Sequence, residues 1–405
     1  MERSAHSERP ENAAEDEYRS RKRAEILDAC RWKLVGALET LGESRGGFLD
    51  DELRAMAWPI LLGVSDGSEK PHSEEADDED ASWKSLARHK DEEQVQLDVN
   101  RAFIYYPRDQ TDAELARRKS ELSDLIVSVL RRYPYLCYFQ GYHDICQVFL
   151  LVLPSAALRS RLVARLSVLR IRDFMLTTLE PTVAQLRLIP DILGAADVSL
   201  RRHLSGTEPF YALAGTLTMY AHDVQAYGDI ARLFDVLLVR EPVFSVYMFA
   251  QIVLDRRDEL FEQAEEDPSM LHLILSKMPQ GMDFEKLIAD TTALYRRYPP
   301  ESLPAWKRIS KASCLKTAKS IDVCAAQTME EGRTYFYKQL AELAAAERRK
   351  KLVRALWAHR KAVGGVGVAV MVGVLAVLLR RHTGALSFLP SIWSGWSNTT
   401  WTYKF

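Results

Sequence analysis

The chain has 405 residues, of which 47% are apolar and 27% charged, so it can fill a large buried core, which excludes wholesale disorder. Its 54 basic and 56 acidic residues nearly cancel, and a net charge of -2 excludes the global positive field with which proteins hold nucleic acid. The five cysteines are widely spaced with no CxxC pair, which argues against a disulfide scaffold or a Cys-rich zinc site.

Two polar segments fall early in the chain. Residues 1–20 lack the apolar run of a secretory signal, and we expect a disordered tail that starts in the cytosol. Residues 65–82 carry eight acidic side chains and one lysine, a composition that predicts a solvated, disordered loop. The alternative for this loop is an acidic patch that docks a partner.

The middle of the chain predicts an all-α fold. Between residues 122 and 130, apolar side chains recur at i, i+3, i+4, i+7 and i+8, the spacing of one helical face. Residues 209–220 and 243–254 are apolar nearly all round, which predicts buried central helices. No stretch alternates as a strand does. We assign residues 21–305 to one large multi-helix domain, in one or two lobes, and residues 306–361 to a helical, basic linker.

Residues 362–379 form an apolar run of 18 residues without a charged or strongly polar side chain. As a helix this run spans roughly 27 Å, close to the hydrocarbon thickness of a membrane. A core helix of a soluble domain would show a polar stripe, and this run has none. The pattern therefore predicts a transmembrane helix.

The charges around that run predict its orientation. Seven Lys or Arg residues lie in 348–361, before the run, and only Arg380, Arg381 and Lys404 follow it. The positive-inside rule places the long N-terminal part in the cytosol and residues 380–405 in the lumen, as a tail anchor. The lumenal tail is aromatic and contains a glycosylation sequon at Asn398.

A search for catalytic motifs first excludes several classes of enzyme. The sequence contains no P-loop, no GxGxxG after a strand, no HExxH and no GxSxG. Three polar clusters remain, and they are Arg54-x-x-x-Trp58, Val95-x-x-Asp98-x-x-Arg101 and Tyr138-x-Gln140-Gly141-x-x-Asp144. Taken singly, each fits a structural role: an amphipathic pair, a surface ion pair worth a few tenths of a kcal/mol, and a loop between helices.

Taken together, in this order and on a helical background, the clusters resemble the RxxxW, IxxDxxR and YxQ motifs of the TBC domain, a GTPase-activating module for Rab GTPases. Val95 in place of isoleucine is the only departure within the motifs. Ala102 follows the arginine where many members have threonine. The resemblance covers most of the helical body.

The resemblance implies that Arg101 and Gln140 are the catalytic side chains. GTP hydrolysis builds charge on phosphate oxygens and needs a positioned water. A guanidinium is permanently charged and can give two hydrogen bonds to phosphate, while a carboxamide can both donate to and accept from water. Arg101 would be the arginine finger and Gln140 the glutamine finger, supplied in trans to the Rab.

The other motif residues are expected to support the fingers, and they are Arg54, Trp58, Asp98, Tyr138, Gly141 and Asp144. Asp98 either holds the finger region or pairs with Arg54. Tyr138 and Gly141 shape the loop of Gln140, and Asp144 braces it or touches the Rab. Trp58 is expected to pack in the core.

The resemblance also implies partners and a location. GTP and Mg²⁺ belong to the Rab, so the chain should need no cofactor, metal or small-molecule substrate of its own. Three further stretches, together with the apolar run, resemble a membrane-anchored branch of the family: Arg172-Asp173-Phe174-Met175, Met278-Pro279-Gln280 and Tyr298-Pro299-Pro300. That likeness implies the endoplasmic reticulum membrane and an early-secretory Rab. A non-catalytic Rab-binding scaffold and a membrane tether are the alternatives, and the sequence leaves the preferred Rab and the oligomeric state open.

Overall fold

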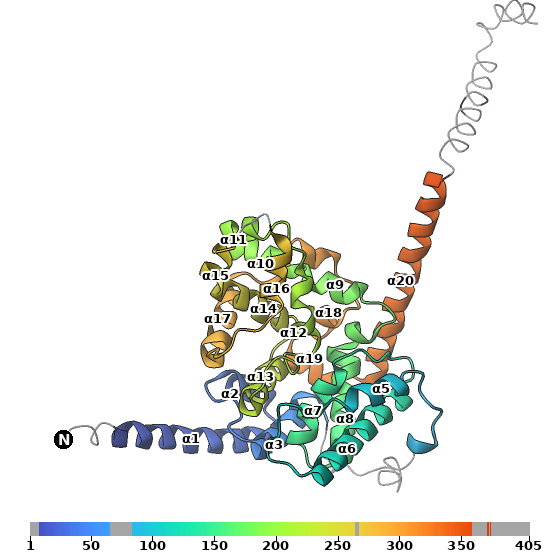
Figure 1. Cartoon of the computed structure of the whole chain (residues 1–405). Coiled ribbons are helices and arrows are strands. Elements are labelled where there is room, and N and C mark those ends of the chain that lie inside the picture. Colours follow the sequence, from blue (N-terminus) through green and yellow to red (C-terminus); the bar gives the residue numbers. More distant parts are fainter. Residues whose placement is uncertain (1–7, 65–82, 264–266, 359–370, 372, 374–405) are drawn as a thin grey trace, which may run out of the picture. The chain divides into compact units, whose positions relative to one another are not determined.

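The computed structural model describes residues 8–64, 83–263, 267–358, 371 and 373, and the regular structure of these residues is entirely helical (Figure 1). The all-α prediction is therefore confirmed for the described chain. The expected acidic loop 65–82, the expected lumenal tail 380–405 and nearly all of the predicted transmembrane run lie outside the described residues. Among the described helices, none has both the length and the apolar content needed to cross a membrane.

The α-helices are, in chain order, α1 (Glu8–Arg31), α2 (Val35–Glu43), α3 (Asp51–Leu61), α5 (Glu92–Val99), α6 (Asp112–Arg132), α7 (Tyr142–Val152), α8 (Ala156–Arg165), α9 (Glu180–Leu186), α10 (Leu188–Ala196), α11 (Val198–His203), α12 (Leu213–Leu217), α13 (Tyr227–Val239), α14 (Phe244–Asp255), α15 (Arg257–Phe261), α16 (Pro268–Leu275), α17 (Phe284–Arg297), α18 (Cys314–Thr317), α19 (Ile321–Ala326) and α20 (Met329–Ala358). The helices of other types are η1 (Trp83–Ser85), η2 (Leu166–Arg170), η3 (Arg172–Met175), η4 (Pro209–Ala212), η5 (Pro300–Ser302) and η6 (Ala305–Arg308). All are 3₁₀ turns except η2, which is a π-helix.

Local sequence explains why these helices form and end where they do. α6 starts at a capping box, in which Thr111 and Glu114 exchange hydrogen bonds, and it ends after two arginines that suit its C-terminal dipole. Its predicted apolar face, residues 122–130, is buried as expected. α14 matches the predicted central helix at 243–254, and most of its side chains are buried.

The second predicted central helix is broken. Residues 209–220 form η4 and the short helix α12, after which Met219 and Tyr220 adopt left-handed backbone angles. Hydroxyl groups bond to the backbone here, because Thr216 Oγ1 donates to Ala212 O over 2.7 Å and Thr218 Oγ1 donates to Ala214 O over 2.9 Å. Such bonds compete with a regular helix, and the prediction of one continuous helix is wrong.

The expected disordered tail is corrected from residue 8 onward. α1 begins at Glu8, and its sequence is rich in Glu, Arg and Ala, which favour a helix whether or not it is buried. The helix is then tied to the body, because Lys22 Nζ donates to Ser44 Oγ over 2.8 Å and to Arg45 O over 2.6 Å. The prediction of disorder from low hydrophobicity was therefore wrong for this segment.

The boundary expected at residue 305 is also corrected. One compact unit runs through Leu340, and a second begins at Ala341. Arg172, which is fully buried, donates to Ala312 O and to Thr317 Oγ1. Its neighbour Asp173 accepts hydrogen bonds from Ser313 Oγ, from Cys314 N over 3.0 Å and from Gln339 Nε2 over 2.9 Å. We call these contacts the Arg172–Asp173 clasp.

A matched pair of substitutions in α20 tests this boundary. Phe336 has no exposed surface and packs on Tyr135 with ring centroids 4.9 Å apart, whereas its neighbour Tyr337 is 52% exposed. Phe336→Ala should lower the free energy of unfolding by about 3–5 kcal/mol in chemical denaturation, because it leaves a cavity in the core. Tyr337→Ala should cost clearly less. Equal, small effects of both would mean that residues 306–340 are a linker after all.

Candidate functional site

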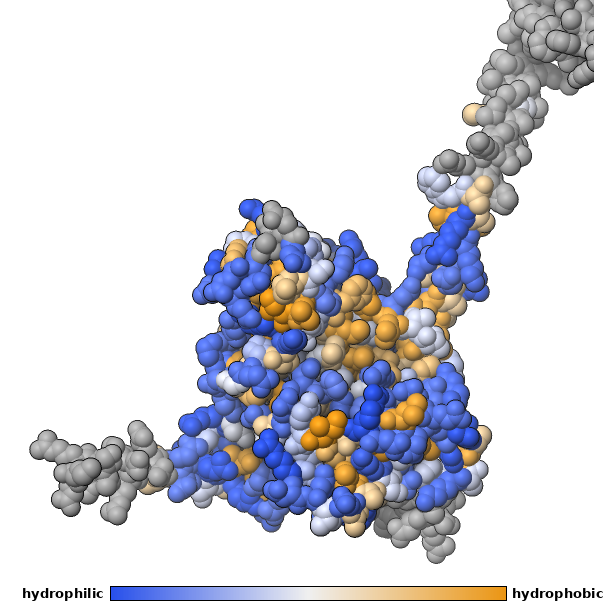
Figure 2. Space-filling view, in the orientation of Figure 1, coloured by the Kyte–Doolittle hydropathy of each residue, from blue (hydrophilic) through white to orange (hydrophobic). Residues whose placement is uncertain are grey.

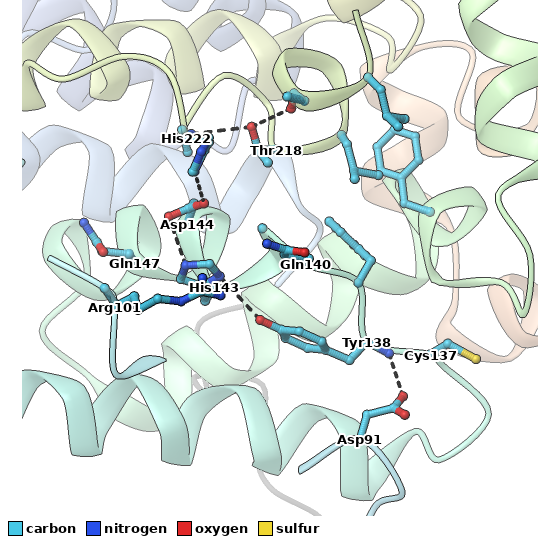
Figure 3. Close-up of a pocket in the computed structure, with 18 of the residues that line it drawn as sticks. Asp91, Arg101, Cys137, Tyr138, Gln140, His143, Asp144, Gln147, Thr218 and His222 are labelled. Carbon is cyan, nitrogen blue, oxygen red and sulfur yellow. Dashed lines mark hydrogen bonds and ion pairs between the residues drawn. The ribbon is translucent and has the colours of Figure 1, made fainter. Parts of the chain in front are cut away.

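A cavity of about 800 Å³ brings the two predicted finger residues together (Figure 3). Its walls come from the loop after α5, the loop before α7, the segment after η3, and α12 with the turn that follows it. Apolar side chains gather on the face of the body around α9 and α12 (Figure 2). Arg101 and Gln140 both line the cavity and both are exposed, the Arg101 side chain by 62%.

A buried carboxyl group holds the Arg101 side chain. Asp98 lies in the last turn of α5 with no exposed surface, and its Oδ1 accepts a hydrogen bond from Arg101 Nη2 over 2.5 Å. Its Oδ2 accepts from Tyr138 Oη over 2.9 Å, and burial together with this bond raises the pKa of Tyr138 far above its usual value. Of the two partners considered for Asp98, the finger region is therefore the right one, and pairing with Arg54 is wrong.

The loop that carries Gln140 is fixed at several points. Asp91 Oδ2 accepts from Tyr138 N over 2.9 Å, and Met175 O accepts from Cys137 N over 2.8 Å. Gly141 follows with φ +99°, a left-handed angle, and a Cβ there would lie 2.5 Å from Cγ2 of Thr218. Only glycine fits both the angle and the space, so Gly141 lets the chain turn directly from Gln140 into α7.

Asp144 belongs to a chain of polar groups along the cavity wall. Its Oδ2 lies 3.0 Å from Nδ1 of His222, and its Oδ1 lies 3.3 Å from Nε2 of His143. Nδ1 of His143 in turn lies 3.4 Å from Tyr138 Oη, so the chain leads back to Asp98. Asp144 therefore braces the wall of the cavity (Figure 3).

Neither histidine was predicted as a site residue, and His222 lies 78 residues from its carboxylate partner. The one available signal was that His143 directly precedes Asp144.

Arg54 and Trp58 lie away from the cavity, in a separate buried cluster around Asp235. Arg54 Nε lies 3.1 Å from both carboxylate oxygens of Asp235, and Trp58 Nε1 donates to Oδ1 over 3.0 Å. Trp58 also packs edge-on against Phe149 of α7, with centroids 5.3 Å apart. These two residues therefore support α7 from outside the cavity. Asp235, which organises the cluster, carried no signal in the sequence.

The pKa values of the two histidines are shifted in opposite directions. The hydrogen bond to Asp144 raises the pKa of His222, whereas burial lowers the pKa of His143. In an NMR titration, Asp144→Asn should bring the pKa of His222 down toward about 6.5. Asp223→Asn, which removes a more weakly acting charge, should lower it less.

The same shift gives a pH dependence of stability. A histidine whose pKa is higher in the folded protein stabilises it below the unfolded pKa, and this stabilisation is lost as the pH rises through the folded value. The contribution of His222 should therefore be fully present below about pH 6.5 and should be lost as the pH rises further, through the higher pKa of the folded protein. An unchanged His222 pKa in Asp144→Asn would contradict the assignment.

Comparison with known proteins places the chain beside a set of GTPase-activating proteins. A family model described as the Rab-GTPase-TBC domain matches residues 51–261. The GTPase-activating protein gyp10 of Schizosaccharomyces pombe is 36% identical over 315 residues, which cover 76% of this chain and 81% of that protein. TBC1 domain family member 20 of Bos taurus is 34% identical over 307 residues, covering 75% and 73%.

Solved structures agree in fold. The Ypt/Rab-GAP domain of Gyp1p superposes with a TM-score of 0.51 at 14% identity and covers 66% of this chain and 99% of that one. A Chlamydomonas flagellar RabGAP TBC domain gives a TM-score of 0.50 at 13% identity, covering 71% and 96%.

Proposed function

Because the chain belongs to the TBC family of Rab GTPase-activating proteins, we propose that it accelerates GTP hydrolysis by supplying Arg101 and Gln140 in trans to a Rab of the early secretory pathway. The observation that carries this proposal is the exposure of both side chains in one cavity. A partner that inserts its nucleotide there could meet a cation and a carboxamide together.

Arg101 is well placed to act on phosphate oxygens. One Nη2 hydrogen bond to the buried Asp98 restrains the guanidinium, although the Arg101 side chain stays 62% exposed. A restrained cation loses less conformational freedom when it binds and needs little reorganisation as charge develops. Tyr138 fixes Asp98 from the other side, so Asp98 and Tyr138 are positioning residues rather than catalytic ones.

Gln140 supplies the second group. Within the described part of the chain its carboxamide has no hydrogen-bond partner, and the rigid turn at Gly141 holds its backbone. A carboxamide in this state can accept a hydrogen bond from the attacking water and donate another. The GTP and its Mg²⁺ are contributed by the Rab, and no covalent intermediate on this chain is needed.

Substitution of either finger tests the mechanism. Arg101→Ala and Gln140→Ala should each remove most of the acceleration in single-turnover GTP hydrolysis with a panel of purified Rabs. An arginine supplied in trans is worth about 10³ to 10⁵ in rate. Arg101→Lys should stay badly impaired because it keeps the charge and loses the planar fork.

Matched controls lie close by. Arg108 is an exposed arginine on the same loop and Gln96 an exposed glutamine on α5, and neither lines the cavity. Arg108→Ala and Gln96→Ala should hydrolyse GTP as the wild type does. Full acceleration by Arg101→Ala would refute the mechanism, and tight Rab binding without any acceleration by the wild type would favour the scaffold alternative.

We also propose that residues 362–379 anchor the chain in the endoplasmic reticulum membrane. The support is the uncharged apolar run and the excess of basic residues before it. Deletion of 362–405 should move the protein from the carbonate-resistant membrane fraction to the supernatant, whereas deletion of 380–405 alone should not. A chain that remains in the membrane fraction after the longer deletion would overturn this proposal.

A further inference from the structure

The loop between α5 and α6 exposes two adjacent side chains, flanked by buried ones, shortly after Arg101. Phe103 and Tyr106 are 6% and 4% exposed, while Ile104 and Tyr105 between them are 74% and 39% exposed. All four line the cavity that holds the two fingers. The loop therefore presents one large aliphatic and one aromatic side chain at the mouth of the site.

A single glutamine fixes this arrangement. Gln147 lies on α7 and is itself buried; its Oε1 accepts from Phe103 N over 2.9 Å and its Nε2 donates to Tyr106 O over 3.3 Å. It binds the backbone on both sides of the exposed pair. Because α7 follows Gln140 directly, Gln147 also ties the loop of one finger to the helix that follows the other.

The backbone of the loop is held in an unfavourable state. Phe103 has φ +64°, a left-handed angle that is costly for a residue with a Cβ. Such angles persist where the surroundings enforce them, and they are frequent at functional sites. Tyr106 supplies a further fixed point, because its Oη donates to Ala221 O over 3.3 Å and its ring lies 5.8 Å from that of Tyr227.

A preorganised apolar pair of this kind has the properties of a binding hot spot. Large apolar and aromatic side chains that are already fixed lose little freedom on binding, and they gain when a partner removes them from water. Leu179 lines the same cavity and is 47% exposed, so a third large apolar side chain is available there to a partner. The surface around the fingers thus favours a partner with an apolar patch beside its nucleotide.

We propose that Ile104 and Tyr105 are the apolar anchor that docks the GTP-loaded GTPase, and that Gln147 sets the position of this anchor relative to Arg101. The inference rests on the proposed function, because the occupant of the cavity is taken to be the GTPase. Continuity with the two fingers supports that occupant over a second copy of this chain or a lipid surface. Ile104 and Tyr105 are docking residues, and Gln147 is a positioning residue.

If Ile104 and Tyr105 form the anchor, substitution of either should change KM without changing kcat. With the full chain and the Rab that gives the highest kcat/KM in a purified panel, Ile104→Ala should raise KM about 10- to 50-fold, because three carbons lose their burial. Tyr105→Ala should raise KM to a similar extent. The value of kcat should stay near that of the wild type, since both fingers remain. Leu97→Ala is the matched control, because Leu97 is 60% exposed on α5 and does not line the cavity.

Gln147 predicts a different kinetic signature. Gln147→Ala should lower kcat as well as raise KM, because the loop that carries Arg101 is no longer fixed to α7. A purely structural role would lower thermal stability and leave kcat of the folded fraction unchanged. The melting temperature of each variant, measured beside its kinetics, separates the two.

The outcomes distinguish this inference from the proposed function. If the wild type accelerates hydrolysis and Arg101→Ala does not, an unchanged KM in Ile104→Ala overturns the anchor alone. If no Rab is accelerated, the finger mechanism fails, and the affinity for Rabs loaded with a non-hydrolysable GTP analogue decides about the anchor: a loss in Ile104→Ala supports it, and equal or absent binding overturns it. A change only in self-association or in pelleting with phosphatidylcholine–phosphatidylserine vesicles would also overturn it.

Discussion

The geometry of the site depends on one buried carboxyl group. Asp98 has no contact with solvent, so its oxygens need donors within the protein, and it obtains them from Arg101, Tyr138 and Gln94. Two of these donors belong to the two loops that carry the fingers. Because burial of a carboxyl group is costly unless it is hydrogen-bonded, Asp98 holds together two segments that are 40 residues apart in the chain.

Helix α7 also connects the parts of the site, because different residues along it contact different neighbouring segments. Gly141 is its N-cap residue, and Gln140 directly precedes Gly141. His143 and Asp144 form the polar wall, and one turn later Gln147 holds the loop of Arg101. Deeper in the body, Phe149 packs on Trp58, which Asp235 holds together with Arg54. The RxxxW motif thus contacts α7 without lining the cavity itself.

The pattern of apolar residues along the chain predicted those helices whose formation depends on neighbouring residues. The apolar face of α6 follows from the spacing of its apolar residues, and α14 follows from a run that is apolar nearly all round. Arg101 and Gln140 were singled out only through the resemblance of three short motifs to a known family. The residues that were missed act over long separations, since Asp235 meets Arg54 across 181 residues and Gln147 meets Phe103 across 44. Periodicity carries no information about such pairs. The boundary at 305 failed for the same reason, because nothing within 306–340 reveals that Asp173 accepts its hydrogen bonds.

The Arg172–Asp173 clasp has a consequence for how the protein is made. Ser313 and Gln339 reach Asp173 from 140 and 166 residues further along the chain. While a ribosome is still translating that stretch, Arg172 has only its bonds to Val168 O and Leu169 O, and Asp173 has only the donor Gln185, so both buried charges lack part of their final partners. Burial of a charge without its full set of partners is strongly disfavoured. The clasp therefore cannot form completely until Gln339 has been synthesised. Before that point the incompletely folded body exposes surface that is normally buried, and chaperones are most needed then.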